Sequence, residues 1–317
     1  MTRRIPQLDL SDYTQGTEKE KSHFIGAWGD GLTEFGFVSL VNHGVDPGLI
    51  ARTYDDAAKL FALSTDVKKK YEVVGGGGQR GYTSFGKEHA KNRTVGDLKE
   101  FWHVGRDLPP GSPRRSSYGD NVFPAELPSF KQNSLDLFAA LDRAAAVMLR
   151  ALANYFTLPT DTFADMAKDG NSILRVIHYP PLKDMFVPGG VRAAEHEDIN
   201  LITLLCESTS SGLEILTRQG DWLTVDALKG QIVVDSGDML SRVTNEVVPA
   251  TTHRVVNPPS TADDVVRYSM PFFVHPYPEC MLRVFDQCVS EKNPKRYPDI
   301  TADAFLQQRL REIGLIK

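Results

Sequence analysis

The first half of the chain carries apolar side chains mainly at helical spacing, with short strand-like runs between. Residues 5–12 alternate apolar and polar side chains, which predicts a first strand. Residues 19–36 carry apolar residues three and four positions apart, as one face of a helix does. A short strand is predicted in 37–44, ended by its Asn-His-Gly turn, and a second helix is predicted to begin near Asp46.

The longest helical pattern covers residues 128–156. Its apolar side chains recur at three or four residues, so they form one stripe along a helix and are predicted to pack in the core. The stripe consists of Phe138, Leu141, Ala145, Met148 and Leu152.

After about Ser172 the pattern changes to short, β-branched runs that are separated by turn residues. Closely spaced short strands of this kind are typical of a sandwich or a barrel. The runs are "SILRVIHYP", "LITLLCES", "LEILTR", "WLTVD", "QIVVDSG", "HRVV" and "VVRYSMPFFVHP". A helical pattern returns at 301–315. We expect a mainly β fold with flanking helices in a single domain over 1–317. Its helix-rich part spans about 1–170, its β core about 171–280, and a helical tail follows.

Composition narrows the functional classes. The 317 residues carry a net charge of -5 with both signs interspersed, so nothing indicates a nucleic acid or membrane partner. Three cysteines without close pairing fit a reducing compartment. The arginines at the start precede no apolar export segment, and no apolar run approaches the roughly 18 residues of a membrane span. We therefore expect a cytoplasmic protein.

The stretch "AAEHEDINLITLL" from Ala193 to Leu205 places one histidine among three acids. If the segment enters a strand, His196 and Asp198 share one face, while Glu195 and Glu197 point to the other. Two residues along a strand span roughly 6.6 Å, so both side chains on one face can reach a single ion. This alternation predicts Asp198 as the carboxylate ligand, provided that the strand is regular.

A third ligand is expected from a distant strand. His253 precedes a β-branched run that follows "QIVVDSGDML", so strands can wind back to bring it near Asp198. Two histidines and one carboxylate with open positions suit non-haem Fe(II) that activates O2. Unrelated buried histidines are the competing interpretation at this point.

The segment "VVRYSMPFF" puts Arg267 and Ser269 on one face of a strand by the same alternation. A guanidinium beside a hydroxyl can bind a carboxylate. A structural ion pair with one of the many acids of the chain is the alternative.

These residues resemble the isopenicillin N synthase-like branch of the Fe(II)/2-oxoglutarate-dependent dioxygenases. The resemblance covers nearly the whole chain and follows the order of the family's segments. The matching segments are "IPQLDLS", "EFGFVSLVNHGV", "RGYTSFG", "GDLKEFWHVG", "LRVIHYPP", "DSGDMLSRVTNEVVPATTHRVV" and "RYSMPFFVHP".

The resemblance implies a double-stranded β-helix, a jelly roll, that holds Fe(II) through His196, Asp198 and His253. It implies that Arg267 and Ser269 hold the distal carboxylate of the co-substrate 2-oxoglutarate, with help from Tyr179. The implied reaction uses O2, releases succinate and CO2, and hydroxylates a small molecule through a ferryl intermediate.

The substrate is not identified by the sequence. Arg175 matches an arginine near the substrate of the bacterial ethylene-forming enzyme, and Tyr82 and Phe85 lie in a segment expected to line the entry. Glu197 and Ile177 depart from residues common in plant members, which leaves details of substrate and co-substrate binding open.

Two alternatives remain at this stage. An isopenicillin N synthase-like oxidase would use no 2-oxoglutarate, and Arg267 and Ser269 would hold the carboxylate of the substrate itself. A jelly-roll protein that binds a ligand or zinc without catalysis belongs to a different class, and the full set of open-site ligands argues against it.

Overall fold

The computed structural model of the protein describes most of the chain. The described residues are 4–75, 78–87, 96–184, 190–225, 229–258 and 264–312. Within these ranges, no helix is both long and apolar enough to cross a membrane.

The N-terminal part is rich in helices, as the apolar spacing predicts. Its elements are β1 (Gln7–Asp9), α1 (Leu10–Thr14), α2 (Glu18–Phe35), β2 (Phe37–Val41), α3 (Pro47–Ala62), α4 (Thr65–Lys69), β3 (Gly81–Thr83), β4 (Glu100–Gly105), α5 (Arg115–Tyr118), α6 (Pro128–Tyr155) and α7 (Thr162–Ala167). The first strand is shorter than predicted because the Asp9 side chain accepts a hydrogen bond from the Ser11 amide at 2.9 Å and begins a helix there.

The second part consists mainly of short strands. Its elements are β5 (Ile173–Tyr179), β6 (Ala193–His196), β7 (Ile202–Cys206), β8 (Leu213–Leu216), β9 (Trp222–Thr224), β10 (Ile232–Ser236), α8 (Asp238–Val243), β11 (His253–Val255), β12 (Arg267–Ser269), β13 (Pro271–Val274), β14 (Met281–Leu282), β15 (Ile300–Thr301) and α9 (Ala302–Glu312). Each of the seven runs predicted to be strands contains at least one strand in the structure. The end of the C-terminal helical pattern, 313–315, lies outside the described residues.

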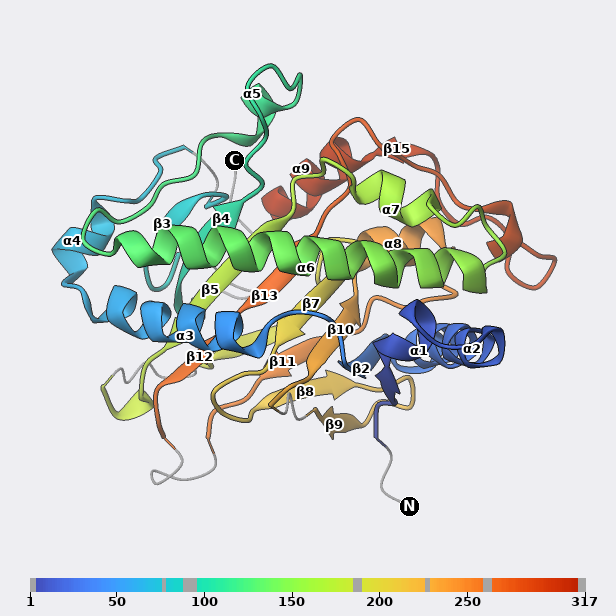
Figure 1. Cartoon of the computed structure of the whole chain (residues 1–317), viewed down its shortest axis with the longest axis horizontal. Helices are drawn as coiled ribbons and strands as arrows, with labels where there is room; N and C mark the ends of the chain where they lie inside the picture. Colours follow the sequence, from blue (N-terminus) through green and yellow to red (C-terminus); the bar gives the residue numbers. More distant parts are fainter. Residues whose placement is uncertain are drawn as a thin grey trace.

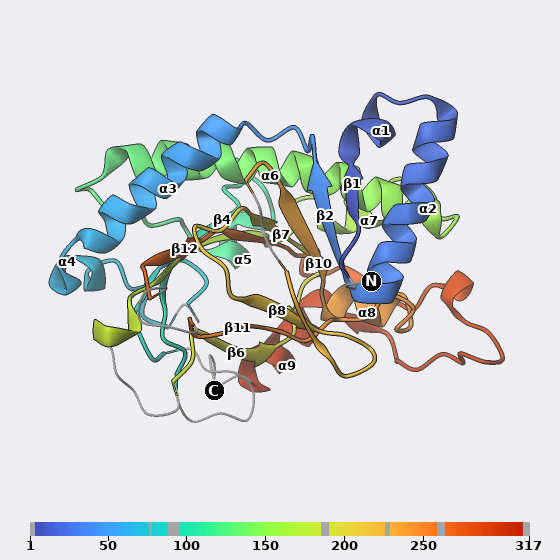
Figure 2. The same cartoon turned by 90° about the horizontal axis from the view of Figure 1, so that it is seen from below.

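Two sheets face each other and form the jelly roll. The larger sheet has the order β1-β2-β10-β7-β13-β5-β4-β3, with β12 pairing β5, and the smaller has the order β6-β11-β8-β9. Figure 2 shows α3 and α6 on one side of the larger sheet and strands β6, β8 and β11 on the other. Strands from both halves of the chain share the larger sheet, which favours the predicted single domain. The predicted double-stranded β-helix is confirmed.

Helix α6 runs across the outer face of the larger sheet (Figure 1). The predicted apolar stripe of this helix is buried, and its Phe138 ring meets Phe272 of β13 edge-on with ring centroids 4.9 Å apart. Helix α6 thus covers the outer face of the larger sheet. The inner face of that sheet faces the smaller sheet, and the cavity described below lies between them.

Phe272→Ala is expected to destabilise the fold by about 3–5 kcal/mol, because it removes a fully buried ring from the α6–sheet contact and leaves a void. Urea or thermal denaturation measures this. Val74→Ala, at a side chain that is 98% exposed, is the control and should change stability by less than about 0.5 kcal/mol. Equal stability of the two variants would contradict the packing described.

Candidate active site

The pairing of β6 with β11 sets two histidines directly opposite each other. His253 is in register with His196, and their ring centroids lie 4.3 Å apart. In each ring Nδ1 contacts a backbone carbonyl, that of Ala194 at 2.7 Å for His196 and that of Thr251 at 3.1 Å for His253. A proton on Nδ1 leaves Nε2 with a lone pair, so both Nε2 atoms can coordinate a metal.

Asp198 completes the group. Its Oδ1 lies 3.9 Å from Nε2 of each histidine, and its Oδ2 accepts a hydrogen bond from the Thr203 hydroxyl. The prediction that Asp198 lies on a regular strand is wrong, because β6 ends at His196 and β7 begins only at Ile202. Asp198 instead lies in the connecting turn, where its carbonyl accepts from the Asp238 amide at 2.7 Å.

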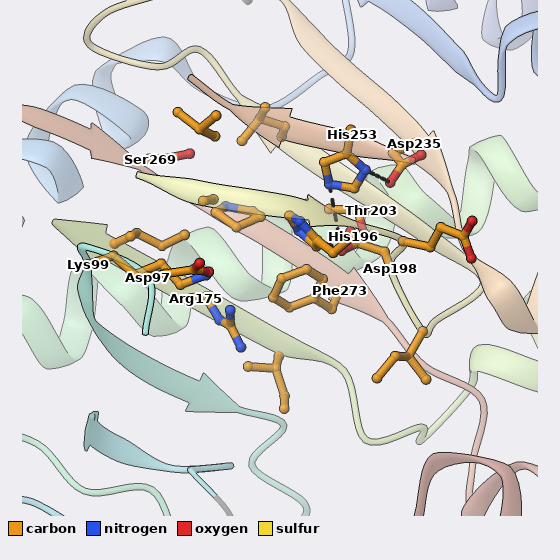
Figure 3. A pocket seen from close by; sticks show the side chains of 18 of the residues that line it. Asp97, Lys99, Arg175, His196, Asp198, Thr203, Asp235, His253, Ser269 and Phe273 are labelled. Atoms are coloured by element: carbon orange, nitrogen blue, oxygen red, sulfur yellow. Dashed lines mark hydrogen bonds and ion pairs between the residues drawn. The ribbon is translucent and has the colours of Figure 1, made fainter. Parts of the chain in front are cut away.

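The candidate ligand atoms of these three residues lie within 4.8 Å of one another (Figure 3). Burial lowers the pKa of His253 to about 4, so its ring is neutral at physiological pH. The exposed Glu197 accepts a hydrogen bond from Thr252 at 3.1 Å and is not part of the group. Two imidazoles and one carboxylate are a donor set that fits Fe(II).

Arg267 of β12 is fully buried. Its Nε donates to the carbonyl of Ser210 at 3.2 Å, whereas its Nη1 has no hydrogen-bond partner among the described residues. The alternative interpretation of Arg267 was a structural ion pair with an acid of the chain. Among the described residues, no carboxylate forms such a pair with Arg267. The Tyr179 ring lies beneath the guanidinium, 5.0 Å from its carbon. A buried cation with an unused donor fits the carboxylate of an anionic ligand.

One cavity of about 280 Å³ joins the candidate ligands and the arginine. Ser269 and Tyr179 line it together with Arg267, because the β12–β5 register places Arg267 opposite Tyr179 and Ser269 opposite Ile177. The structure therefore brings together the three predicted metal ligands and the three predicted co-substrate residues.

Arg175 also lines the cavity. Its Nε donates to His103 Nε2 at 2.6 Å, and its guanidinium lies 4.2 Å from the Phe101 ring centroid and 5.1 Å from that of Phe273 (Figure 3 labels Arg175 and Phe273). These two rings hold the guanidinium in place from β4 and β13.

The entry residues expected from the sequence lie elsewhere. Neither Tyr82 nor Phe85 lines the cavity between the sheets. Tyr82 is buried on the opposite face of the larger sheet, where its hydroxyl donates to Glu100. The expectation was wrong for Tyr82 because β3 pairs with β4 in a register that turns this side chain toward the helices.

Sequence reasoning missed several cavity residues. Asp97 and Lys99 form a buried ion pair of 2.8 Å in the cavity wall, and Leu306 and Arg309 of α9 line the cavity as well. Asp97 and Lys99 are two residues apart just before a strand, so their side chains could have been predicted to lie on the same face. Arg309 gave no such signal, because its place at the cavity depends on how α9 packs.

A jelly roll that presents two histidines and an aspartate with open coordination positions defines a class, the non-haem Fe(II) oxygenases. Comparison with known families agrees with this class. Residues 5–126 match the family described as "non-haem dioxygenase in morphine synthesis N-terminal", and residues 170–276 match the "2OG-Fe(II) oxygenase superfamily".

Whole-chain relatives point the same way. A Caulobacter crescentus protein described as "a putative 2OG-Fe(II) oxygenase family protein" is 44% identical, with a TM-score of 0.88 over 99% of this chain and 100% of that chain. A 2-oxoglutarate-dependent dioxygenase of Monascus ruber is 31% identical over 89% of this chain and 88% of its own. A Neurospora crassa protein, solved in complex with α-ketoglutarate and thymine, is 29% identical, with a TM-score of 0.85 over 97% and 96% of the two chains.

The chain belongs to the 2OG-Fe(II) oxygenase superfamily. It is an Fe(II)- and 2-oxoglutarate-dependent oxygenase whose co-substrates are 2-oxoglutarate and O2. Because the relatives use 2-oxoglutarate, the comparisons do not favour an oxidase without it or a binding protein without catalysis.

His253→Ala is expected to weaken Fe(II) binding severely, since it removes one of the three candidate protein ligands. Anaerobic titration of the metal-free protein with Fe(II) measures the affinity. Glu197→Ala is the matched control from the same segment and should bind Fe(II) like the unmodified protein. Full Fe(II) affinity in His253→Ala would show that the ligand set is a different one.

Proposed function

We propose that His196, Asp198 and His253 hold Fe(II), and that Arg267 and Ser269, with Tyr179, bind the distal carboxylate of 2-oxoglutarate. The enzyme then hydroxylates a small molecule that enters the same cavity beside Arg175. The observation that carries this proposal is the buried Arg267, whose Nη1 lacks a partner among the described residues and whose side chain lines the cavity of the metal group.

The chemistry divides between the metal and the chain. Bound Fe(II) supplies the activation of O2 that is coupled to decarboxylation of 2-oxoglutarate to succinate and CO2. Arg267 contributes a fixed positive charge and a planar donor set that orient the co-substrate along the cavity. Ile177, Leu205 and Val255 line the same cavity with apolar side chains and exclude water from the reacting atoms.

The substrate end of the cavity is bounded by Arg175 and Phe273, with Leu306 and Arg309 of α9 as further wall residues. Thymine is the first compound to test because it is bound in a crystal structure of the Neurospora crassa relative. A screen of small molecules that reads out succinate above the uncoupled background would identify the substrate. We also propose a cytoplasmic location, which the three free cysteines favour.

Arg267→Ala should raise the dissociation constant for 2-oxoglutarate by about two orders of magnitude or more. Breaking a buried charge pair from one side costs about 3–5 kcal/mol, and roughly 1.4 kcal/mol corresponds to tenfold. Calorimetric titration of the Fe(II)-loaded, oxygen-free protein with 2-oxoglutarate measures this constant. Fe(II) affinity should survive, because Arg267 is not a ligand.

Arg267→Lys is the conservative comparison. It should recover only part of the affinity, since lysine offers a point charge in place of a planar pair of donors. A well-folded Arg267→Ala protein that binds 2-oxoglutarate with unchanged affinity would refute the assignment of this residue.

A further inference from the structure

A second polar cluster, buried except for the partly exposed His178, lies on the opposite face of the larger sheet. It consists of Lys68, Tyr82, Glu100 and His178, and is called the back-face cluster below. None of these four side chains lines the cavity, and Glu100 at its centre is 1% exposed.

Glu100 accepts hydrogen bonds from three different elements. Lys68 of α4 donates to its two carboxylate oxygens at 2.9 and 2.8 Å, and Tyr82 of β3 donates through its hydroxyl. His178 of β5 contacts it through Nδ1 at 2.8 Å. Burial acts to raise the pKa of Glu100, but the bonds from His178, Lys68 and Tyr82 lower it below its ordinary value. Glu100 is therefore an ionised, fully partnered carboxylate.

His178 connects this cluster to β12. Its ring stacks on Phe61 of α3 and on Tyr268 of β12, with centroid distances of 5.2 and 5.3 Å and interplanar angles of 21° and 22°. The Phe61 and Tyr268 rings also stack on each other, 6.4 Å apart, so the three rings form one cluster. Tyr268 is the middle residue of Arg267–Ser269 and is in register with His178. Its two neighbours in sequence point to the cavity, because successive side chains of a strand alternate between faces.

This ring cluster is one of the contacts that hold β12, together with the hydrogen bonds between Thr209 and the Tyr268 backbone. The strand has three residues, and within the described part of the chain it pairs only with β5. Tyr179, which lies under the Arg267 guanidinium, directly follows His178 on β5. A shift of the His178 ring would therefore act on both strands that carry the co-substrate residues.

We propose that Glu100 and His178 are positioning residues, which hold Arg267, Ser269 and Tyr179 in the geometry that binds 2-oxoglutarate. This inference rests on the proposed function of those three residues. Glu100 fixes the His178 ring by hydrogen bonding, and the ring fixes β12 by stacking on Tyr268. The back-face cluster thus contributes to co-substrate affinity without contact with the co-substrate.

His178→Phe tests this, because phenylalanine keeps an aromatic ring against Phe61 and Tyr268 but cannot bond to Glu100. The dissociation constant for 2-oxoglutarate should rise about tenfold, the lower end of what the loss of an outer-shell partner costs at metal sites. Fe(II) affinity should stay unchanged. The measurement is calorimetric titration of the Fe(II)-loaded, oxygen-free full chain.

A double-mutant cycle shows whether His178 acts through Arg267. In the Arg267→Ala background, His178→Phe should cause no further loss of 2-oxoglutarate affinity, because the group that it positions is absent. A loss of about tenfold in both backgrounds would overturn the proposal. If Arg267→Ala alone leaves the affinity unchanged, the proposed function fails first, so the two failures are distinguishable.

Asn245→Ala is the control for a merely structural role. Asn245 is fully buried, its side chain donates to the carbonyls of Cys288 and Asn293, and it does not line the cavity. This variant should lower the melting temperature but keep 2-oxoglutarate affinity. The same pattern in His178→Phe would overturn the proposal. If His178→Phe does not fold, Tyr82→Phe replaces it, with a rise of about threefold expected for one lost hydrogen bond and unchanged affinity as the contrary result.

Discussion

The register between β6 and β11 is the constraint on which the active site depends. It sets His196 opposite His253 and brings their Nε2 atoms to the same distance from Asp198 Oδ1. A slip of one residue would turn one histidine to the other face of the small sheet. The backbone carbonyls that face each Nδ1 then orient the two imidazole rings by main-chain contacts.

The proposed co-substrate end of the cavity differs from the metal end. There a strong hydrogen-bond donor, Arg267 Nη1, has no partner among the described residues. Arg267 is buried without an acid partner among the described residues, which is costly for a protein in its ligand-free form. A dicarboxylate that reaches both the metal and this guanidinium satisfies the charge. On the other face, Glu100 has its partners within the protein, and this contrast underlies the different roles proposed for the two groups.

Much of the site could be predicted from local sequence patterns, because period-two alternation determines which side chains share a face. This holds for His196 on β6 and for Arg267 with Ser269 on β12. Asp198 was placed beside His196 on the premise that both lie on one regular strand, and this premise is wrong. Asp198 lies in a turn, where Thr203 and Asp238 donate hydrogen bonds to it. Tyr82 and Arg309 could not be placed, because their positions depend on long-range register and helix packing. The many short strands predicted a sandwich or a barrel, and the jelly roll was predicted from the family resemblance alone.

A structure of the protein with Fe(II) and 2-oxoglutarate, determined without oxygen, tests the central claim most directly. The account predicts one metal ion bound by Nε2 of His196, Nε2 of His253 and a carboxylate oxygen of Asp198. It also predicts that the distal carboxylate of 2-oxoglutarate accepts hydrogen bonds from Arg267, including its Nη1, and from Ser269. A 2-oxoglutarate molecule bound with Arg267 Nη1 still unpartnered would contradict it, as would a metal ion held by other residues.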